Sequence, residues 1–161
     1  MNERESFAKR LHSEIPAFLR VIRAMPADRL DYRPHPKSTA AGDLAWMLAQ
    51  EAGQAGTLID AGRVEYVEEP APKSVETIAS AFERGAVEIE KRLPGLDEAR
   101  WQRKAQFLYG GKVAWEETLG EMLWGFLFDM VHHRGQLSTY LRPMGGKVPS
   151  IYGPSGDDPG A

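Results

Sequence analysis

The stretch WEETLGEMLWGFLFDMVHHRGQLSTYLR, residues 115–142, is the longest segment with helical periodicity. Its apolar positions alternate spacings of four and three, which places one set of side chains on a single face: Leu119, Leu123, Phe126, Met130, His133, Leu137 and Tyr140. This spacing is typical of a helix that packs into an antiparallel bundle. We predict a helix that begins between Trp115 and Thr118 and ends near Arg142, before Pro143.

Three further amphipathic segments precede it. The first runs from Asn2 to Met25. The second begins after a serine or threonine at 38–39, either of which could cap it, and ends near Ala61 before a glycine. The third follows Ser74 and ends near Leu93, and one or two extra helical turns are expected within residues 97–103.

No run of alternating β-branched residues competes with these helices. The predicted fold class is therefore all-α, a four-helix bundle with a long crossover between the second and third helices. Residues 1–145 would form the bundle, and residues 146–161 would be a Gly/Pro-rich tail of the same domain.

Length and composition narrow the functional classes. The 161 residues fit one domain, and the absence of cysteine excludes disulfides, thiolate zinc sites and a catalytic cysteine. With 20 basic and 23 acidic residues the net charge is −3, which argues against a nucleic-acid partner. The charged opening MNERESFAKR predicts no signal peptide, and no apolar stretch is long enough to cross a bilayer. We expect a cytoplasmic protein without a membrane partner.

Two polar residues of the last helix fall where the pattern calls for apolar ones. His133 lies within the apolar seam and Asp129 lies one turn earlier on the same face. One interpretation is a satisfied polar pair in the core. The other is a pair of ligands for a divalent metal, because residues at i and i+4 can converge on one ion.

Glu51 is a third polar residue on an apolar face, in the middle of the stripe of the second helix. A carboxylate there needs a partner, because an unpaired buried charge is costly. The partner could be an arginine, such as Arg134 or Arg142, or it could be a metal or a substrate group.

The last helix also has an apolar face opposite the seam, formed by Trp124, Phe128 and Val131. A helix that is apolar on two sides needs cover on both. The first hypothesis is a homodimer with a second copy on this face. The alternative is that the C-terminal tail folds back over it.

The segments FDMVHHRGQLSTYLRPMGGKVPSIYGPSGDD (128–158) and LDYRPHPKSTAAGDLAWMLAQE (30–51) resemble the DinB-like superfamily, also called the DinB/YfiT group. The resemblance implies a four-helix bundle with a long crossover, commonly homodimeric. It also implies a metal, often nickel or zinc, held by three histidines. The matching positions here are Met47, Asp129 and His133, so only one histidine is retained.

The two departures differ in chemistry. A carboxylate such as Asp129 can bind zinc, whereas the thioether of Met47 is a poor ligand beside oxygen donors. Glu51, one turn from Met47 on the same face, could substitute. The sequence therefore predicts a candidate metal site of His133, Asp129 and Glu51 between the second and last helices.

The resemblance also implies an activity, because characterised relatives include thiol-dependent transferases and isomerases. In these the metal lowers the pKa of a bound thiol. Residues expected to contact substrate or support the ligands are Met47, His132, Arg134, Gln136 and Tyr140. The alternative is a metal-free, non-catalytic dimeric bundle that binds a small molecule or acts as a scaffold.

Overall fold

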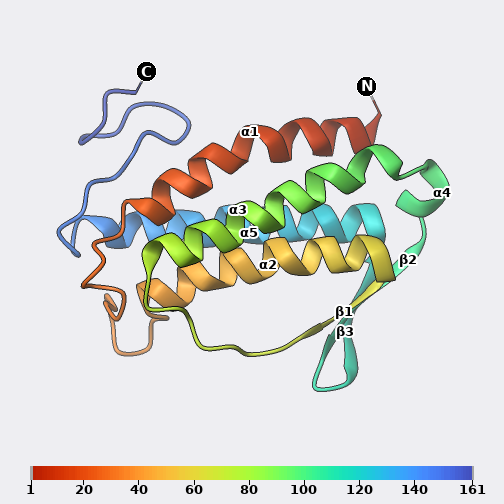
Figure 1. Ribbon diagram of the computed structural model, residues 1–161, viewed down its shortest axis with the longest axis horizontal. Helices are drawn as coiled ribbons and strands as arrows, with labels where there is room; N and C mark the ends of the chain where they lie inside the picture. The colour runs from red at the N-terminus through yellow and green to blue at the C-terminus, as the bar shows by residue number, and fades with distance from the viewer. Residues whose placement is uncertain (1, 161) are drawn as a thin grey trace.

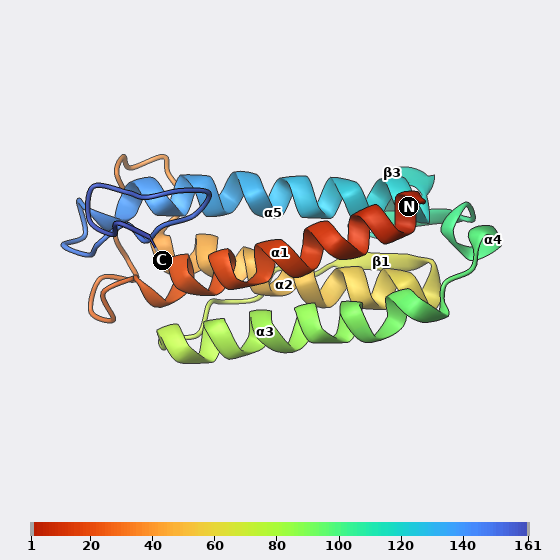
Figure 2. The same cartoon turned by 90° about the horizontal axis from the view of Figure 1, so that it is seen from above.

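The computed structural model describes residues 2–160, and four long helices lie side by side within that range (Figures 1 and 2). They are α1 (Glu3–Arg23), α2 (Ala41–Ala61), α3 (Val75–Arg92) and α5 (Leu119–Leu141). Their facing sides form one hydrophobic core that includes Phe18, Leu48 and Phe82. The predicted bundle is thus present, and each long helix lies close to its expected bounds.

The start of α2 differs from the prediction. Ala40 occupies the N-cap position, without a side-chain hydrogen bond, in place of the expected serine or threonine cap. The first two helical N–H groups, of Ala41 and Gly42, donate instead to the carbonyl oxygens of Tyr32 and Leu30. The preceding loop therefore satisfies the helix end that a capping side chain would otherwise serve.

The connection from α2 to α3 returns along the bundle. Gly62 ends α2 in the left-handed conformation, with φ of 71°, as predicted. The chain then forms β1 (Arg63–Tyr66) and runs back beside α2 to the start of α3 (Figure 1). As a result α2 and α3 point in the same direction, which is the crossover arrangement expected from the long connection.

A three-stranded sheet interrupts the helices, so the prediction of an all-α fold without strands is wrong. Strand β1 pairs in parallel with β2 (Lys104–Tyr109), which pairs antiparallel with β3 (Lys112–Thr118). The turn residues Gly110 and Gly111 have φ values of 58° and 74°. A two-residue hairpin turn requires such positive values, and this glycine pair is the signal that the helical analysis missed.

The sheet packs where α2 and α5 meet. Phe107 of β2 and Trp115 of β3 contact Phe126 of α5, with ring centroids 6.0 and 6.2 Å apart. A Cβ atom at Gly125 would lie 2.2 Å from the Trp115 ring, so glycine lets this tryptophan lie against α5. The 3-10 turn η1 (Leu93–Gly95) and the short α4 (Glu98–Trp101) join α3 to β2, and α4 confirms the extra helical turn.

The second apolar face of α5 is partly covered by α1. Trp124 packs edge-on against Phe7, with centroids 5.2 Å apart, whereas Phe128 remains 65% exposed. The C-terminal segment lies beside α1 and the other end of α5 (Figure 2). There Asp157 pairs with Arg142 at 2.8 Å. The tail therefore folds back on the bundle but leaves Phe128 uncovered.

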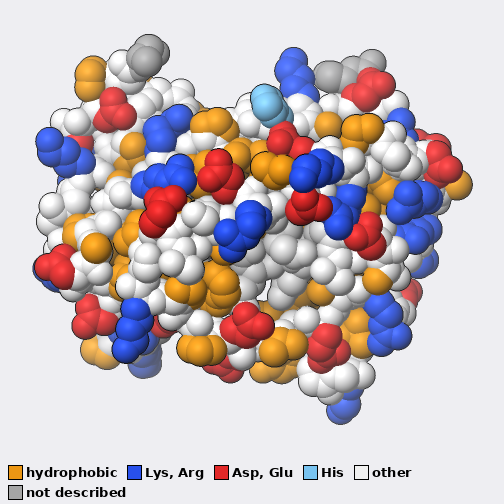
Figure 3. Space-filling model, viewed as in Figure 1, with side chains coloured by type: hydrophobic (Ala, Val, Ile, Leu, Met, Phe, Trp, Pro, Cys, Tyr) orange, Lys and Arg blue, Asp and Glu red, His pale blue; other side chains and the backbone are white. Residues whose placement is uncertain are grey.

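Acidic, basic and hydrophobic side chains are intermixed across the face of the molecule shown in Figure 3. That face carries no extended basic surface of the kind that tracks a nucleic-acid backbone. Within residues 2–160, no helix has both the length and the apolar character that a membrane span requires.

Candidate metal centre

Glu51 of α2 and the pair Asp129 and His133 of α5 meet between the two helices. Each offers one potential ligand atom, and the three atoms lie within 4.8 Å of one another. The Nε2 atom of His133 is 3.5 Å from Oδ2 of Asp129 and 3.7 Å from Oε1 of Glu51. Tetrahedral ligands at ordinary bond lengths are separated by about 3.4 Å, so the spacing fits a small divalent cation.

Gln136 sets the orientation of the imidazole. Its Oε1 atom lies 2.8 Å from Nδ1 of His133 and accepts the proton of that nitrogen. The lone pair is then on Nε2, which faces the two carboxylates. A hydrogen bond of this kind is how proteins fix the tautomer of a metal-ligating histidine.

Glu51 is the buried member of the group, with 8% of its surface exposed. Its Oε2 atom has no hydrogen-bond partner among the described residues. Burial, followed by the charge of Asp129 and a hydrogen bond to it, raises the pKa of Glu51 to about 9. Asp129 is more open, with 57% of its side chain exposed.

These three residues are stable together only with a positive charge or a proton between them. Two carboxylates and an imidazole lone pair converge, and one buried oxygen has no partner. Like charges at this distance repel strongly when one of them is removed from water. A divalent cation satisfies all three groups at once, so the residues fit the metal that the sequence predicts.

A cavity of about 160 Å³ adjoins this group. Its walls come from α2, α5 and the sheet, and they comprise Met47, Gln50, Glu51, Gln54, Tyr66, Phe107, Phe126 and Asp129. Tyr66 of β1 and Phe107 of β2 were absent from the predicted site, because no sequence signal indicated these strands. Met47 lines the cavity as an apolar wall beside Glu51.

Other predicted site residues lie elsewhere. His132 is exposed on α5 beside the ring of His133, with ring centroids 5.2 Å apart. Tyr140 packs edge-on against Tyr32, with centroids 5.9 Å apart. Neither residue lines the cavity.

Arg134 points away from the cavity and toward α1. Its Nη1 atom donates to the Glu14 carboxylate at 2.6 Å, and its Nη2 atom donates to the Tyr152 hydroxyl at 2.5 Å. The Tyr152 hydroxyl also donates to Glu14 at 2.9 Å. Neither Arg134 nor Arg142 therefore pairs with Glu51.

Glu14 is a buried, ion-paired carboxylate that the sequence analysis did not single out. It is 3% exposed and lies between Leu11 and Phe18 on the buried face of α1. That spacing of three and four residues was the available signal for a buried carboxylate. Its partner could not be identified from α1 alone.

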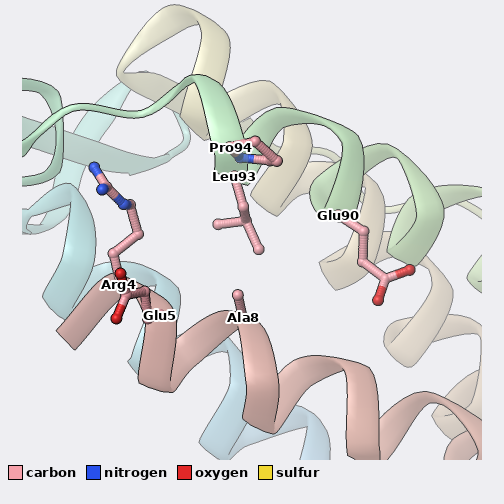
Figure 4. Close-up of a pocket in the computed structure, with 6 residues that line it drawn as sticks. All are labelled: Arg4, Glu5, Ala8, Glu90, Leu93 and Pro94. Carbon is pink, nitrogen blue, oxygen red and sulfur yellow. The ribbon is translucent and has the colours of Figure 1, made fainter. Parts of the chain in front are cut away.

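A second hollow, of about 280 Å³, lies between the start of α1 and the end of α3 (Figure 4). Ala8, Leu93 and Pro94 supply its apolar lining. Arg4 donates to the carbonyl oxygen of Leu96, and Glu90 lies 2.7 Å from the ring of His12. Because these polar groups already have partners, the hollow is a weaker candidate than the three-residue group.

Comparison with known proteins identifies a match to one protein family. The model of the DinB family matches residues 1–159. The DinB-like protein from Bacillus cereus is 18% identical in sequence, with a TM-score of 0.76 over 92% of this chain and 97% of that chain. A comparison with curated proteins finds no match.

Two other solved structures share the fold. YfiT from Bacillus subtilis, described as a probable metal-dependent hydrolase with an unusual four-helix bundle topology, is 14% identical, with a TM-score of 0.68 and 89% of each chain covered. A mutant of the mycothiol-dependent maleylpyruvate isomerase is 10% identical, with a TM-score of 0.59 over 92% of this chain and 63% of that chain. At these identities the likeness shows the fold alone.

Proposed function

The chain belongs to the DinB family, and we propose that it is a metal-dependent thiol transferase whose site lies between α2 and α5. One observation carries the proposal. Glu51, Asp129 and His133 converge around one point, and the buried Oε2 atom of Glu51 has no partner. Such an arrangement is typical of residues that bind a cation.

Zinc or nickel is the ion we propose, held by these three residues. One imidazole and two carboxylates suit divalent ions of borderline hardness. When bound, the ion would lower the pKa of a coordinated thiol so that the thiolate is available at neutral pH. The sulfur would then bond to an electrophilic carbon, whose leaving group departs with its electron pair while the thiol proton passes to solvent.

The protein's own residues would orient the ligands and exclude water. Gln136 holds His133 with Nε2 toward the carboxylates. Phe107 and Phe126, whose rings contact each other, and Met47 supply apolar lining to the cavity. An apolar wall beside the ligands suits a thiol and an organic electrophile, because water is poorly accommodated there.

The descriptions of two structural neighbours support this class of reaction. YfiT is described as a probable metal-dependent hydrolase, and the isomerase as mycothiol-dependent. The first description names a hydrolysis, and the second names dependence on a thiol. We propose the thiol for this chain, and hydrolysis is an outcome that the test can reveal.

The test uses tag-free protein stripped with EDTA and reloaded with zinc or nickel. Mycothiol or cysteine would be the thiol, monochlorobimane the acceptor, and the fluorescent conjugate the product. We expect metal-dependent conjugation that His133→Ala abolishes and His132→Ala retains. Cleavage of a nitrophenyl ester without conjugation would replace the transferase with a hydrolase. No turnover with either substrate would contradict enzymatic function.

A second candidate function is a metal-free bundle that binds a small molecule. The observation in its favour is the raised pKa of Glu51, about 9, which keeps this carboxyl protonated at neutral pH. A protonated Glu51 can donate to Asp129, so the group is stable without an ion. In that case the cavity would hold an uncharged organic ligand.

We also propose that the protein is a homodimer, with Phe128 at the centre of the interface. Phe128 is 65% exposed and stacks on Trp124, with ring centroids 5.7 Å apart. The two stacked rings together present apolar surface on one side of α5, and contiguous exposed apolar surface marks an interaction site. Phe7 of the same chain already packs against Trp124. The proposed contact between the two subunits is therefore smaller than the sequence indicates.

A further inference from the structure

A larger hollow of about 460 Å³ adjoins the cavity beside the metal ligands. The two share Met47, Gln50 and Tyr66 as lining residues, so they are adjacent, and we refer to them together as the groove, with an inner and an outer part. Most residues that line the outer part come from α2 and from the segment that follows β1. This segment runs back along α2 (Figure 1). Its lining consists of Thr39, Asp43, Trp46, Met47, Gln50, Tyr66, Glu68, Glu69 and Pro70.

The outer groove is acidic. Asp43, Glu68 and Glu69 contribute three carboxylates, and no lysine or arginine lines either part of the groove within residues 2–160. Arg33 reaches Asp43 at 3.7 Å from outside the groove. Glu68 and Glu69 have no ion-pair partner among the described residues. A concave wall of one charge raises the local concentration of ligands of the opposite charge.

Two polar groups along this groove also lack partners. The indole Nε1 atom of Trp46 is buried without a hydrogen bond. At the inner end, Glu51 is 8% exposed, and its Oε2 atom is unsatisfied. Buried polar groups normally have a partner, so these exceptions indicate a ligand that supplies one. The indole requires an acceptor, which an ammonium group does not offer, so it is the carboxyl group that points to a cationic or hydrogen-donating ligand.

The remaining walls suit an organic body. Trp46, Tyr66 and Met47 present two aromatic rings and a thioether along the groove. Aromatic faces attract organic ammonium groups, and adjacent carboxylates strengthen that attraction. A carboxylate-bearing molecule would meet the same three acidic residues and be repelled.

We propose that this groove binds the positively charged, amine-bearing part of an organic substrate, next to the Glu51, Asp129 and His133 group. The assignment of this molecule as the substrate rests on the proposed function. Binding in the outer groove does not, because Asp43, Glu68 and Glu69 are separate from the three metal ligands. The structure thereby favours cationic over anionic substrates for this site.

The experiment uses two probes that share a skeleton and differ in charge: phenethylamine and 3-phenylpropionate. Each is titrated calorimetrically into the EDTA-treated full-length protein at low salt. We expect binding of the amine and none of the acid. The Glu68→Gln/Glu69→Gln variant should weaken amine binding by about five- to tenfold, because two exposed charges are lost. Added salt should weaken it in the wild type.

A matched control is Glu116→Gln/Glu117→Gln, which removes two adjacent carboxylates from β3 outside the groove. It should leave amine binding unchanged. Equal binding of both probes, no binding of the amine, or equal loss in the two double variants would each overturn the proposal. The binding experiment involves neither metal nor turnover. The proposed groove can therefore fail while the transferase assay succeeds, and the transferase assay can fail while the groove binds the amine.

Discussion

Glu51 combines burial, a nearby carboxylate and an oxygen without a partner. Its pKa is raised from 4.5 to about 9 in the folded protein. Between these values the metal-free folded state keeps a proton that the unfolded chain has released. The folded state therefore loses stability relative to the unfolded chain as pH rises through this window, and below pH 4.5 this group imposes no such loss.

Glu51→Gln should remove that loss. In EDTA-treated protein at pH 8, we expect the variant to be more stable than the wild type by about 1–3 kcal/mol, with a smaller difference at pH 5. Urea denaturation of both proteins at several pH values measures this difference in the free energy of unfolding. Identical pH dependence of the two proteins would show that Glu51 ionises normally. With zinc present the order should reverse, because only the wild type retains all three ligands.

Arg134 and Glu14 form the other buried charged group, at 2% and 3% exposure. Arg134→Met removes the buried charge partner of Glu14, which then keeps only the Tyr152 hydroxyl and the exposed Arg10 at 3.8 Å, and should cost about 3–5 kcal/mol. Glu14→Leu combined with Arg134→Met should recover most of the loss, because no charge remains buried. The free energy of unfolding in urea measures both. A double variant no more stable than the single one would show that Arg134 contributes through packing.

Among the elements, the close approach of α2 and α3 depends on one glycine. A Cβ atom at Gly85 of α3 would lie 2.9 Å from the Cβ of Ala52 and from the backbone of Gly53. Gly85→Ala should force the helices apart and cost about 1–3 kcal/mol. The matched control is Gly53→Ala, where a Cβ meets nothing within 4 Å.

The control should stabilise the protein by about 0.5–1 kcal/mol, because alanine is the better helix former. Thermal unfolding followed by circular dichroism compares the two variants. Equal effects of the two substitutions would contradict the proposed contact between the helices.

The helices could be predicted from sequence because their signals are local. The apolar spacing of α5, the Ser74 cap and the Gly62 stop are each contained within a few neighbouring residues. The sheet could not be predicted the same way. Strand β1 has four residues, and its partner β2 is some forty positions later in the chain, so no local pattern specifies the pairing. Only Gly110 and Gly111 gave a local indication of the hairpin.

The same distinction applies to the candidate site. Asp129 and His133 share a face of one helix, and Glu51 stands out on the apolar stripe of another, so their proximity follows from the bundle. Tyr66 and Phe107 enter the cavity from the sheet and were therefore missed. Arg134 is adjacent to His133 in sequence, yet the helix turns it toward Glu14.

For the whole molecule, the exposed Phe128 predicts self-association. We expect sedimentation velocity to give a dimer at micromolar concentrations, and Phe128→Asp to give a monomer with an unchanged helical spectrum. Val113→Asp is the control, because Val113 is 51% exposed and belongs to β3 and not to α5. A monomeric wild type, or dissociation by both substitutions, would contradict an interface at Phe128.

Direct binding is the simplest test of whether Glu51, Asp129 and His133 form a metal site. Tag-free protein is stripped with EDTA, titrated with zinc or nickel in a calorimeter, desalted and analysed for metal by plasma mass spectrometry. We expect about one ion per chain in the wild type and in His132→Ala, and none in His133→Ala. Failure of the wild type to retain either ion, or equal retention by the two histidine variants, would contradict this metal site.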